Sequence, residues 1–255
     1  MEIAVEHIYQ MMGQYFWPFC RIAAFFMVVP IIGTALVSMR IRLGLALAVT
    51  AVIGMTIEPL NAIDPFSSAA MVIIVQQILI GVVMAFVMQF LFQVFSLAGQ
   101  MIAMQNGLGF GTLIDPVNGI AVTSISQLYL MTVNLLFFTM NGHLILITML
   151  AESFGILPIG NALPDASLLV LVNTGSWLFG SAVLVAWPAV IALLVVNFTF
   201  GVISRVAPQM NIISIGFPFT MVMGLIINWF VLGNVQPQFD FLSAHSFDML
   251  RGILR

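Results

Sequence analysis

The chain has 255 residues, of which 62% are hydrophobic and only 6% are charged, whereas about a quarter of the residues of an ordinary soluble domain are charged. Nine acidic and six basic residues cannot form a polar shell around a soluble fold of this length. The composition therefore predicts an integral membrane protein, or a subunit that partners cover on nearly every side. The formal charge of −3, without a basic stripe, excludes nucleic acid as a partner.

Charged residues and turn-forming loops divide the chain into long apolar segments, whose lengths we compare with the roughly 20 helical residues that cross a bilayer. We expect helices at approximately residues 11–37, 43–57, 69–104, 123–150, 168–204 and 212–235. The second segment is short for a span, and the uncharged stretch around the third is too long for one. The sequence thus predicts an all-α membrane-associated fold of about six long, partly broken helices in hairpins that do not all cross the bilayer.

The first segment contains an arginine, Arg21, at a depth where an unpaired guanidinium is costly. We expect a carboxylate or helix-end carbonyls to be its partner. The single cysteine, Cys20, cannot form an internal disulfide, and the three histidines lie far apart in sequence, so we expect neither a metal site nor a cofactor.

Polar residues form a narrow face on the third segment and a second narrow face on the fourth segment. The face on the fourth segment begins at Thr123. The expected members are Gln89, Gln93, Gln100, Gln127, Asn134 and Asn141, with Ser96 among those on the third segment. Carboxamides that faced lipid would leave donors and acceptors unpaired. Two interpretations stay open, namely hydrogen bonding between helices and the lining of an aqueous conduit.

A glycine-rich stretch, "NGLGFG", lies between the third and fourth segments. It differs from a phosphate-binding loop because no strand is expected before it and no lysine follows. Gly107, Gly109 and Gly111 allow an unusual backbone path that presents Leu108 and Phe110 on a flexible arm. An apolar arm beside polar helix faces is typical of a plug, since a hydrophobic constriction closes a wet pore by dewetting.

The remaining charges inside or near apolar segments are interpreted as buried or structural. His143 and Glu152 lie near the end of the fourth segment and Arg205 near the end of the fifth. They lack the nucleophile, orienting group and metal ligands of a catalytic site. We therefore expect no enzymatic activity.

Four stretches together resemble the FliR family, the export-gate membrane proteins of flagellar type III secretion, and its injectisome counterparts. They are Arg21–Gly33, Ala98–Gly119, Asn141–Gly160 and Gly201–Phe219. The resemblance covers almost the whole chain in the family's order. The family usually has an acidic residue before the "LIG" of the third segment, where this chain has Gln76 and Gln77. The absence of a lysine after "GFPF" favours the flagellar branch.

The resemblance implies a subunit that assembles with FliP and FliQ into a closed helical cone, contacts FlhB, and forms part of the channel for unfolded flagellar subunits. It implies a place in the bacterial inner membrane at the flagellar basal body, raised towards the periplasm and partly covered by lipid. It also implies two parts, a P-like part over residues 1–167 and a Q-like helical hairpin with a C-terminal tail over residues 168–255.

The plug loop of the family corresponds to residues 107–118, so the resemblance adds Asp115 and Pro116 to the plug, with Phe110 as the first choice for the blocking residue. Two other hypotheses are a polytopic secondary transporter and a purely structural nucleus for assembly of the export apparatus. A transporter of that class would show an inverted repeat and an ion site at the membrane midplane.

Overall fold

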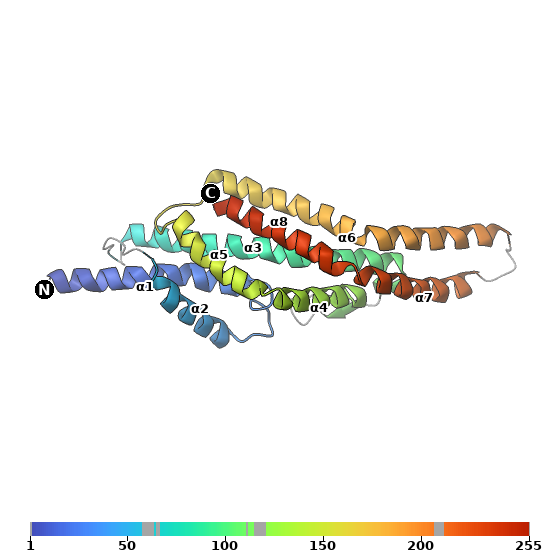
Figure 1. Ribbon diagram of the computed structural model, residues 1–255, viewed down its shortest axis with the longest axis horizontal. Coiled ribbons are helices and arrows are strands. Elements are labelled where there is room, and N and C mark those ends of the chain that lie inside the picture. The colour runs from blue at the N-terminus through green and yellow to red at the C-terminus, as the bar shows by residue number, and fades with distance from the viewer. Residues whose placement is uncertain are drawn as a thin grey trace. The chain divides into compact units, whose positions relative to one another are not determined.

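The computed structural model describes residues 2–57, 64, 67–110, 112–114, 121–206 and 212–254. Within those ranges the helices are α1 (Glu2–Val28), α2 (Met39–Gly54), α3 (Ser68–Gln105), α4 (Ser124–Thr139), α5 (Gly142–Ile156), α6 (Asp165–Val206), α7 (Ile212–Leu232) and α8 (Val235–Leu254) (Figure 1). A 3₁₀ turn, η1 (Leu108–Phe110), and two short strands, β1 (Thr112–Ile114) and β2 (Ala121–Thr123), lie between α3 and α4. The predicted all-α fold class is confirmed.

The boundaries differ from the prediction in three places. The first helix begins at Glu2, before the predicted start, and ends at Val28, because a stretch containing Pro30 links it to α2. The fourth segment is two helices bent by 68°, since Asn141 between them takes a left-handed φ of 54°. The residues after 235, predicted as a tail, form α8, which is bent by 56° from α7. Polar residues interrupt α8, so a search for apolar runs misses it.

Two helices of the described chain, α3 and α6 from Leu169 onwards, are long and apolar enough to cross a membrane, and each bent pair could add one more. With 38 residues, α3 is roughly 57 Å long at about 1.5 Å per residue. The hydrocarbon core measures about 30 Å. A perpendicular crossing therefore uses only about half of α3, in agreement with the expectation that the segments are not all plain spans.

The chain forms two compact units. One contains residues 1–89, 140–174 and 246–255, and the other contains residues 90–139 and 175–245. The helices α3, α6 and α8 contribute residues to both units. The predicted boundary between residues 167 and 168 falls in the first turn of α6, and the compact units do not follow it. The likeness of the two predicted parts to two partner proteins stays a prediction.

In the first unit, α1 packs closely against α2 and α3 (Figure 1). Gln14 donates a hydrogen bond from Nε2 to the carbonyl oxygen of Gly54 at 3.0 Å. At Gly81 the backbones of α1 and α3 approach so closely that an added Cβ would overlap the carbonyl oxygen of Arg21. Small residues thus set the spacing of this unit.

In the second unit, four aromatic rings from α3, α4 and α8 form the centre of the core. Phe92 stacks edge-on against Phe137, with 5.4 Å between the ring centroids, and Phe95 lies 5.8 Å from Phe239. These rings are almost fully buried. Because aromatic side chains bury a large apolar area and prefer such tilted geometries, the cluster fixes the middle of α3 in its unit.

Candidate functional site

The glycine-rich segment begins where α3 ends. Gly107 has a φ of 78°, the left-handed conformation that commonly terminates helices, and its N–H donates to the carbonyl of Met104 at 3.3 Å. The turn η1 follows, and then β1 and β2 pair antiparallel with Thr112 opposite Thr123 and Ile114 opposite Ala121. The predicted flexible arm therefore includes a short two-stranded ribbon.

Sequence reasoning did not find this ribbon, although the chain carries a signal for it. The strands are three residues each, too short for an alternating pattern to stand out. Their β-branched residues flank a stretch that contains the dipeptides Asp-Pro and Asn-Gly, which are typical of turns.

The predicted plug residues fall into three groups. Gly107, Leu108 and Gly109 are described and half-buried. The backbone of Phe110 belongs to η1. The predictions for Gly111, Asp115 and Pro116 lie outside the described residues. The plug role of the segment stays a prediction.

Three consecutive residues at the start of this segment contact α6 or α7. The carbonyl of Gln105 accepts a hydrogen bond from Nδ2 of Asn197 at 3.4 Å. The fully buried side chain of Asn106 lies directly on Gly224. Gly107 lies under the ring of Phe217, so that a Cβ added to this glycine would be 2.9 Å from Cε2 of the ring. Sequence reasoning named only Gly107 as a site residue, because Asn197, Phe217 and Gly224 come from helices that are distant in sequence.

Among the described residues, the polar faces of α3 and α4 are joined by a hydrogen bond between two serines. Ser126 Oγ donates to the carbonyl of Ser96 at 2.7 Å, and the two hydroxyl oxygens are 3.0 Å apart. Gly99 permits this approach, since an added Cβ would lie 2.6 Å from the Cα of Ser126. At this point the face connects α3 to α4, as the first of the two open interpretations expects.

The glutamines and asparagines of these faces are not fully buried within the chain. Gln89, Gln93, Gln100, Gln127 and Asn134 are half-buried. The predicted stripe from Thr123 to Asn141 is wrong at both ends, because Thr123 belongs to β2 and the exposed Asn141 lies in the turn between α4 and α5. Whether the remaining residues line a conduit stays a prediction.

Arg21 is fully buried in the first unit and is surrounded by uncharged groups. Its Nε donates to Oε1 of Gln77 at 2.9 Å. One terminal nitrogen donates to the carbonyl and hydroxyl of Ser153 at 3.0 and 3.1 Å, and the other donates to the carbonyl of Leu157 at 2.8 Å. The guanidinium also lies 4.2 Å above the ring centre of Phe154.

The electrostatics of this cluster depend on the end of α5. Its last carbonyls carry the partial negative charge of a helix C-terminus, which favours a cation. Arg21 lies in α1, outside the candidate spans. Burial lowers the pKa of its guanidinium to about 9, so the group keeps its charge at neutral pH. Of the two partners expected for Arg21, helix-end carbonyls are the ones present.

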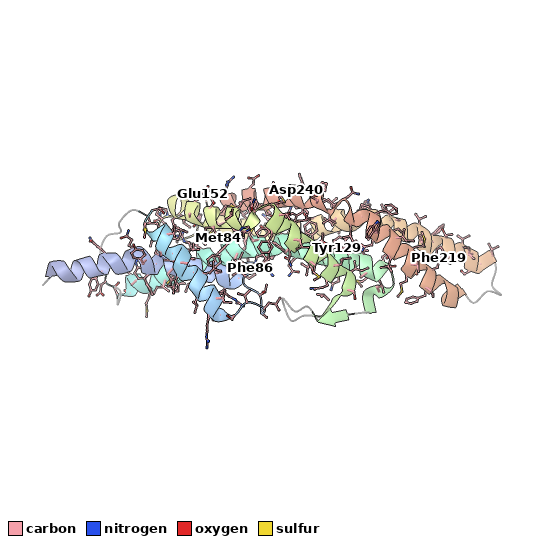
Figure 2. The ribbon with its side chains drawn as sticks, turned by 60° about the horizontal axis from the view of Figure 1, so that its bottom comes forward. Met84, Phe86, Tyr129, Glu152, Phe219 and Asp240 are labelled. Atoms are coloured by element: carbon pink, nitrogen blue, oxygen red, sulfur yellow. The ribbon has the colours of Figure 1, made fainter. Side chains whose placement is uncertain are left out.

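The other predicted charges are less buried than expected. His143 is half-buried, whereas Glu152 and Arg205 are exposed. Glu152 (Figure 2) precedes the buried Ser153 by one residue and so lies about 100° away from it around α5. Arg205 lies in the last turn of α6, where residues 201–206 are all exposed. Neither residue is therefore a buried charge within this chain, and a structural role for them stays a prediction.

Long apolar helices, a left-handed glycine that ends one of them ahead of a short ribbon, and a buried arginine held by neutral groups are features of an integral membrane protein. Over the described ranges, no group of three or more histidines, cysteines and carboxylates is placed to hold a metal ion.

Comparison with known proteins gives the particular family. The family described as "Bacterial export proteins, family 1" matches residues 12–245. The flagellar biosynthetic protein FliR of Escherichia coli is 35% identical over 255 residues, which cover 100% of this chain and 97% of that protein. FliR of Pectobacterium carotovorum is 35% identical over 95% of this chain and 93% of its own length, and FliR of Aquifex aeolicus is 31% identical over 81% and 80%.

The chain therefore belongs to the FliR family, as its motifs predicted. It is a membrane component of flagellar biosynthesis within the bacterial export proteins, and it belongs to the flagellar apparatus of the inner membrane. This membership favours the export component over the secondary transporter.

Proposed function

We propose that this chain forms part of the channel through which unfolded flagellar subunits leave the cytoplasm, with residues 107–118 as a plug that closes the resting channel. The observation that carries the proposal is the end of α3. There a 38-residue helix stops at a left-handed glycine, and a 3₁₀ turn and a short ribbon follow within an otherwise helical membrane protein. Irregular backbone of this kind is tolerated near a membrane only where protein or water surrounds it.

The partners that we propose are FliP, FliQ and FlhB, together with lipid and the unfolded export substrates. Large apolar side chains that remain exposed on α6 and α7 support this, among them Trp187, Phe198, Trp229 and Phe230. Only 33% of the most apolar stretch of α6 is buried within the chain. Faces of this size require other helices or lipid to cover them.

We also propose that the assembled subunits form a closed cone raised towards the periplasm, in which the chain acts without catalysis. The lengths of α3 and α6 support this arrangement, since both exceed what a perpendicular crossing requires. The P-like and Q-like parts, residues 1–167 and 168–255, would then face different partners.

Site-specific crosslinking from position 110 tests whether substrate touches this chain. A photoreactive residue replaces Phe110 in the assembled apparatus, and an export substrate is stalled by a folded domain at its end. We expect a crosslink to the stalled substrate, and none from an exposed position in the middle of α2, such as Leu47. A complex that assembles and exports without any crosslink from position 110 would instead favour the structural assembly nucleus.

A further inference from the structure

The start of the glycine-rich segment is held on one side by α6 and α7, within a single compact unit. Gln105, Asn106 and Gly107 follow one another in the chain, and each contacts a different residue of these two helices. Asn197 donates to the carbonyl of Gln105, and the ring of Phe217 covers Gly107. Because three consecutive residues are engaged, the direction in which the segment leaves α3 is fixed here.

Asn106 provides the tightest of these contacts. Its side chain is completely buried and lies on Gly224 of α7, where an added Cβ would overlap Oδ1, Cγ and Nδ2 of the amide. Gly224 and Phe217 are seven residues apart, two turns of helix, and therefore lie on the same face of α7. One face of α7 thus supports both Asn106 and Gly107.

The amide of Asn106 is also unsatisfied. Neither Oδ1 nor Nδ2 has a hydrogen-bond partner in the part of the chain that the structure describes. A buried amide without partners loses the hydrogen bonds that water would give it, and it regains them once it is exposed. The docked position of Asn106 is therefore well packed and at the same time opposed by desolvation.

We propose that Asn106, Gly224, Phe217 and Asn197 form a reversible latch for the plug segment. Packing against α7 holds the base of the segment in the resting state, and the unsatisfied amide keeps that state only slightly favoured, so that an engaged substrate releases it. The latch rests on the proposed function, since it regulates the same plug. The four are positioning residues, and they act through the segment that follows them.

The first test replaces Gly224 by alanine in the co-expressed export complex and measures the leak of ions or small solutes from whole cells. The new methyl group displaces Asn106, and we expect the leak to rise by about ten-fold or more, as overpacking of a tight contact shifts the position of the residue it touches. The matched control is Gly201→Ala on α6, where no atom lies within 4 Å of an added Cβ. We expect no leak from the control.

A double substitution separates the latch from general damage to α7. Asn106→Ala removes the three atoms that the new methyl group would overlap, so Gly224→Ala combined with Asn106→Ala should leak no more than about twice as much as Asn106→Ala alone. Asn106→Leu keeps the shape without the unsatisfied polar atoms, and we expect slower export without leak. If Gly224→Ala raises the leak of the Asn106→Ala chain by the same factor as it raises the leak of the wild type, the methyl group acts independently of Asn106, and this result would overturn the latch.

A second pair of variants adds no atoms to the core. Phe217→Ala uncovers Gly107, whereas Phe219→Ala removes a ring of similar exposure on the same helix (Figure 2), which stacks on Phe200 instead. We expect only Phe217→Ala to leak, with both complexes purifying in equal amounts. If Phe110→Ala leaks while the Gly224 and Phe217 variants stay sealed, the latch fails and the plug stands. If Phe110→Ala also stays sealed, the plug itself fails.

Discussion

At the scale of the residue, Arg21 shows how this chain places a charge where no water reaches. Five donor hydrogens on a planar group allow one guanidinium to reach Gln77, Ser153 and Leu157 from three different nitrogens, whereas a lysine ammonium has three donors on a single nitrogen. The neutral partners satisfy its hydrogen bonds but leave its charge without a counter-ion. Gln77 is also poorly matched, because its Nε2 is buried and has no hydrogen-bond partner among the described residues.

Replacing Gln77 by glutamate is therefore expected to stabilise the protein. The carboxylate would accept the same hydrogen bond from Arg21, supply the missing charge and remove the unsatisfied N–H. The desolvation cost of the arginine is already part of the wild-type stability, so the attraction has only the cost of the new carboxylate to offset, and we expect a gain of about 1–3 kcal/mol. Thermal unfolding of the purified export complex in detergent measures it as a rise in Tm.

The neighbouring Gln76→Glu is the control for that substitution. Gln76 is half-buried, and its Oε1 accepts no hydrogen bond within the described chain, so a carboxylate there would bury a charge without the arginine as partner. We expect Gln76→Glu to lower the Tm. A Gln77→Glu complex that melts at or below the melting temperature of the wild type would contradict this prediction. It would show that the neutral hydrogen-bond acceptors around Arg21 already compensate its charge.

At the scale of the element, glycines determine which helices meet. Gly81 allows α1 to touch α3, Gly99 allows α4 to touch α3, and Gly224 receives Asn106. In an apolar environment helices gain little from hydrophobic burial against one another, so close backbone contact and interhelical hydrogen bonds carry more of the association. The helix contacts of this chain are accordingly sensitive to single methyl groups.

Alanine substitution at Gly81 and at Gly44 is predicted to change the stability of the complex in opposite directions. Gly81→Ala forces the backbones of α1 and α3 apart and should lower the stability of the complex by about 1–3 kcal/mol or more. Gly44→Ala, on an exposed face of α2 with no atom within 4 Å, should raise it by up to about 1 kcal/mol through helix propensity alone. Both are measured as shifts in Tm, and equal shifts would contradict the close contact.

At the scale of the whole molecule, composition and motifs were sufficient for the fold class and the family. The long apolar run from Ala69 to Met104 gives α3 almost residue for residue, since a continuous apolar stretch is the strongest helix signal in a membrane protein. The helix and the helix break that the sequence did not predict also have physical causes. The helix α8 is amphipathic rather than apolar, and the break at Asn141 depends on one left-handed residue within an apolar pattern.

The candidate site was predictable only in part. A run of glycines after a long helix indicates an unusual backbone path, and Gly107 is where that path begins. Which residues hold it could not be read from the sequence, because Asn197, Phe217 and Gly224 lie far from Asn106 in the chain and no local pattern connects them. The same is true of Arg21, whose partners come from α3 and α5. Tertiary contacts of this kind require the structure.

Residues 107–118 are proposed to close the resting channel, and the ion conductance of the complex tests this proposal. The purified complex is reconstituted in a planar bilayer with the wild-type chain, with Phe110→Ala, or with residues 109–111 deleted. If the segment is the plug, the wild-type complex stays closed, and both variants conduct ions without substrate, because the constriction that excludes water is lost. Assembled variant complexes with the same closed conductance as the wild type would contradict the claim.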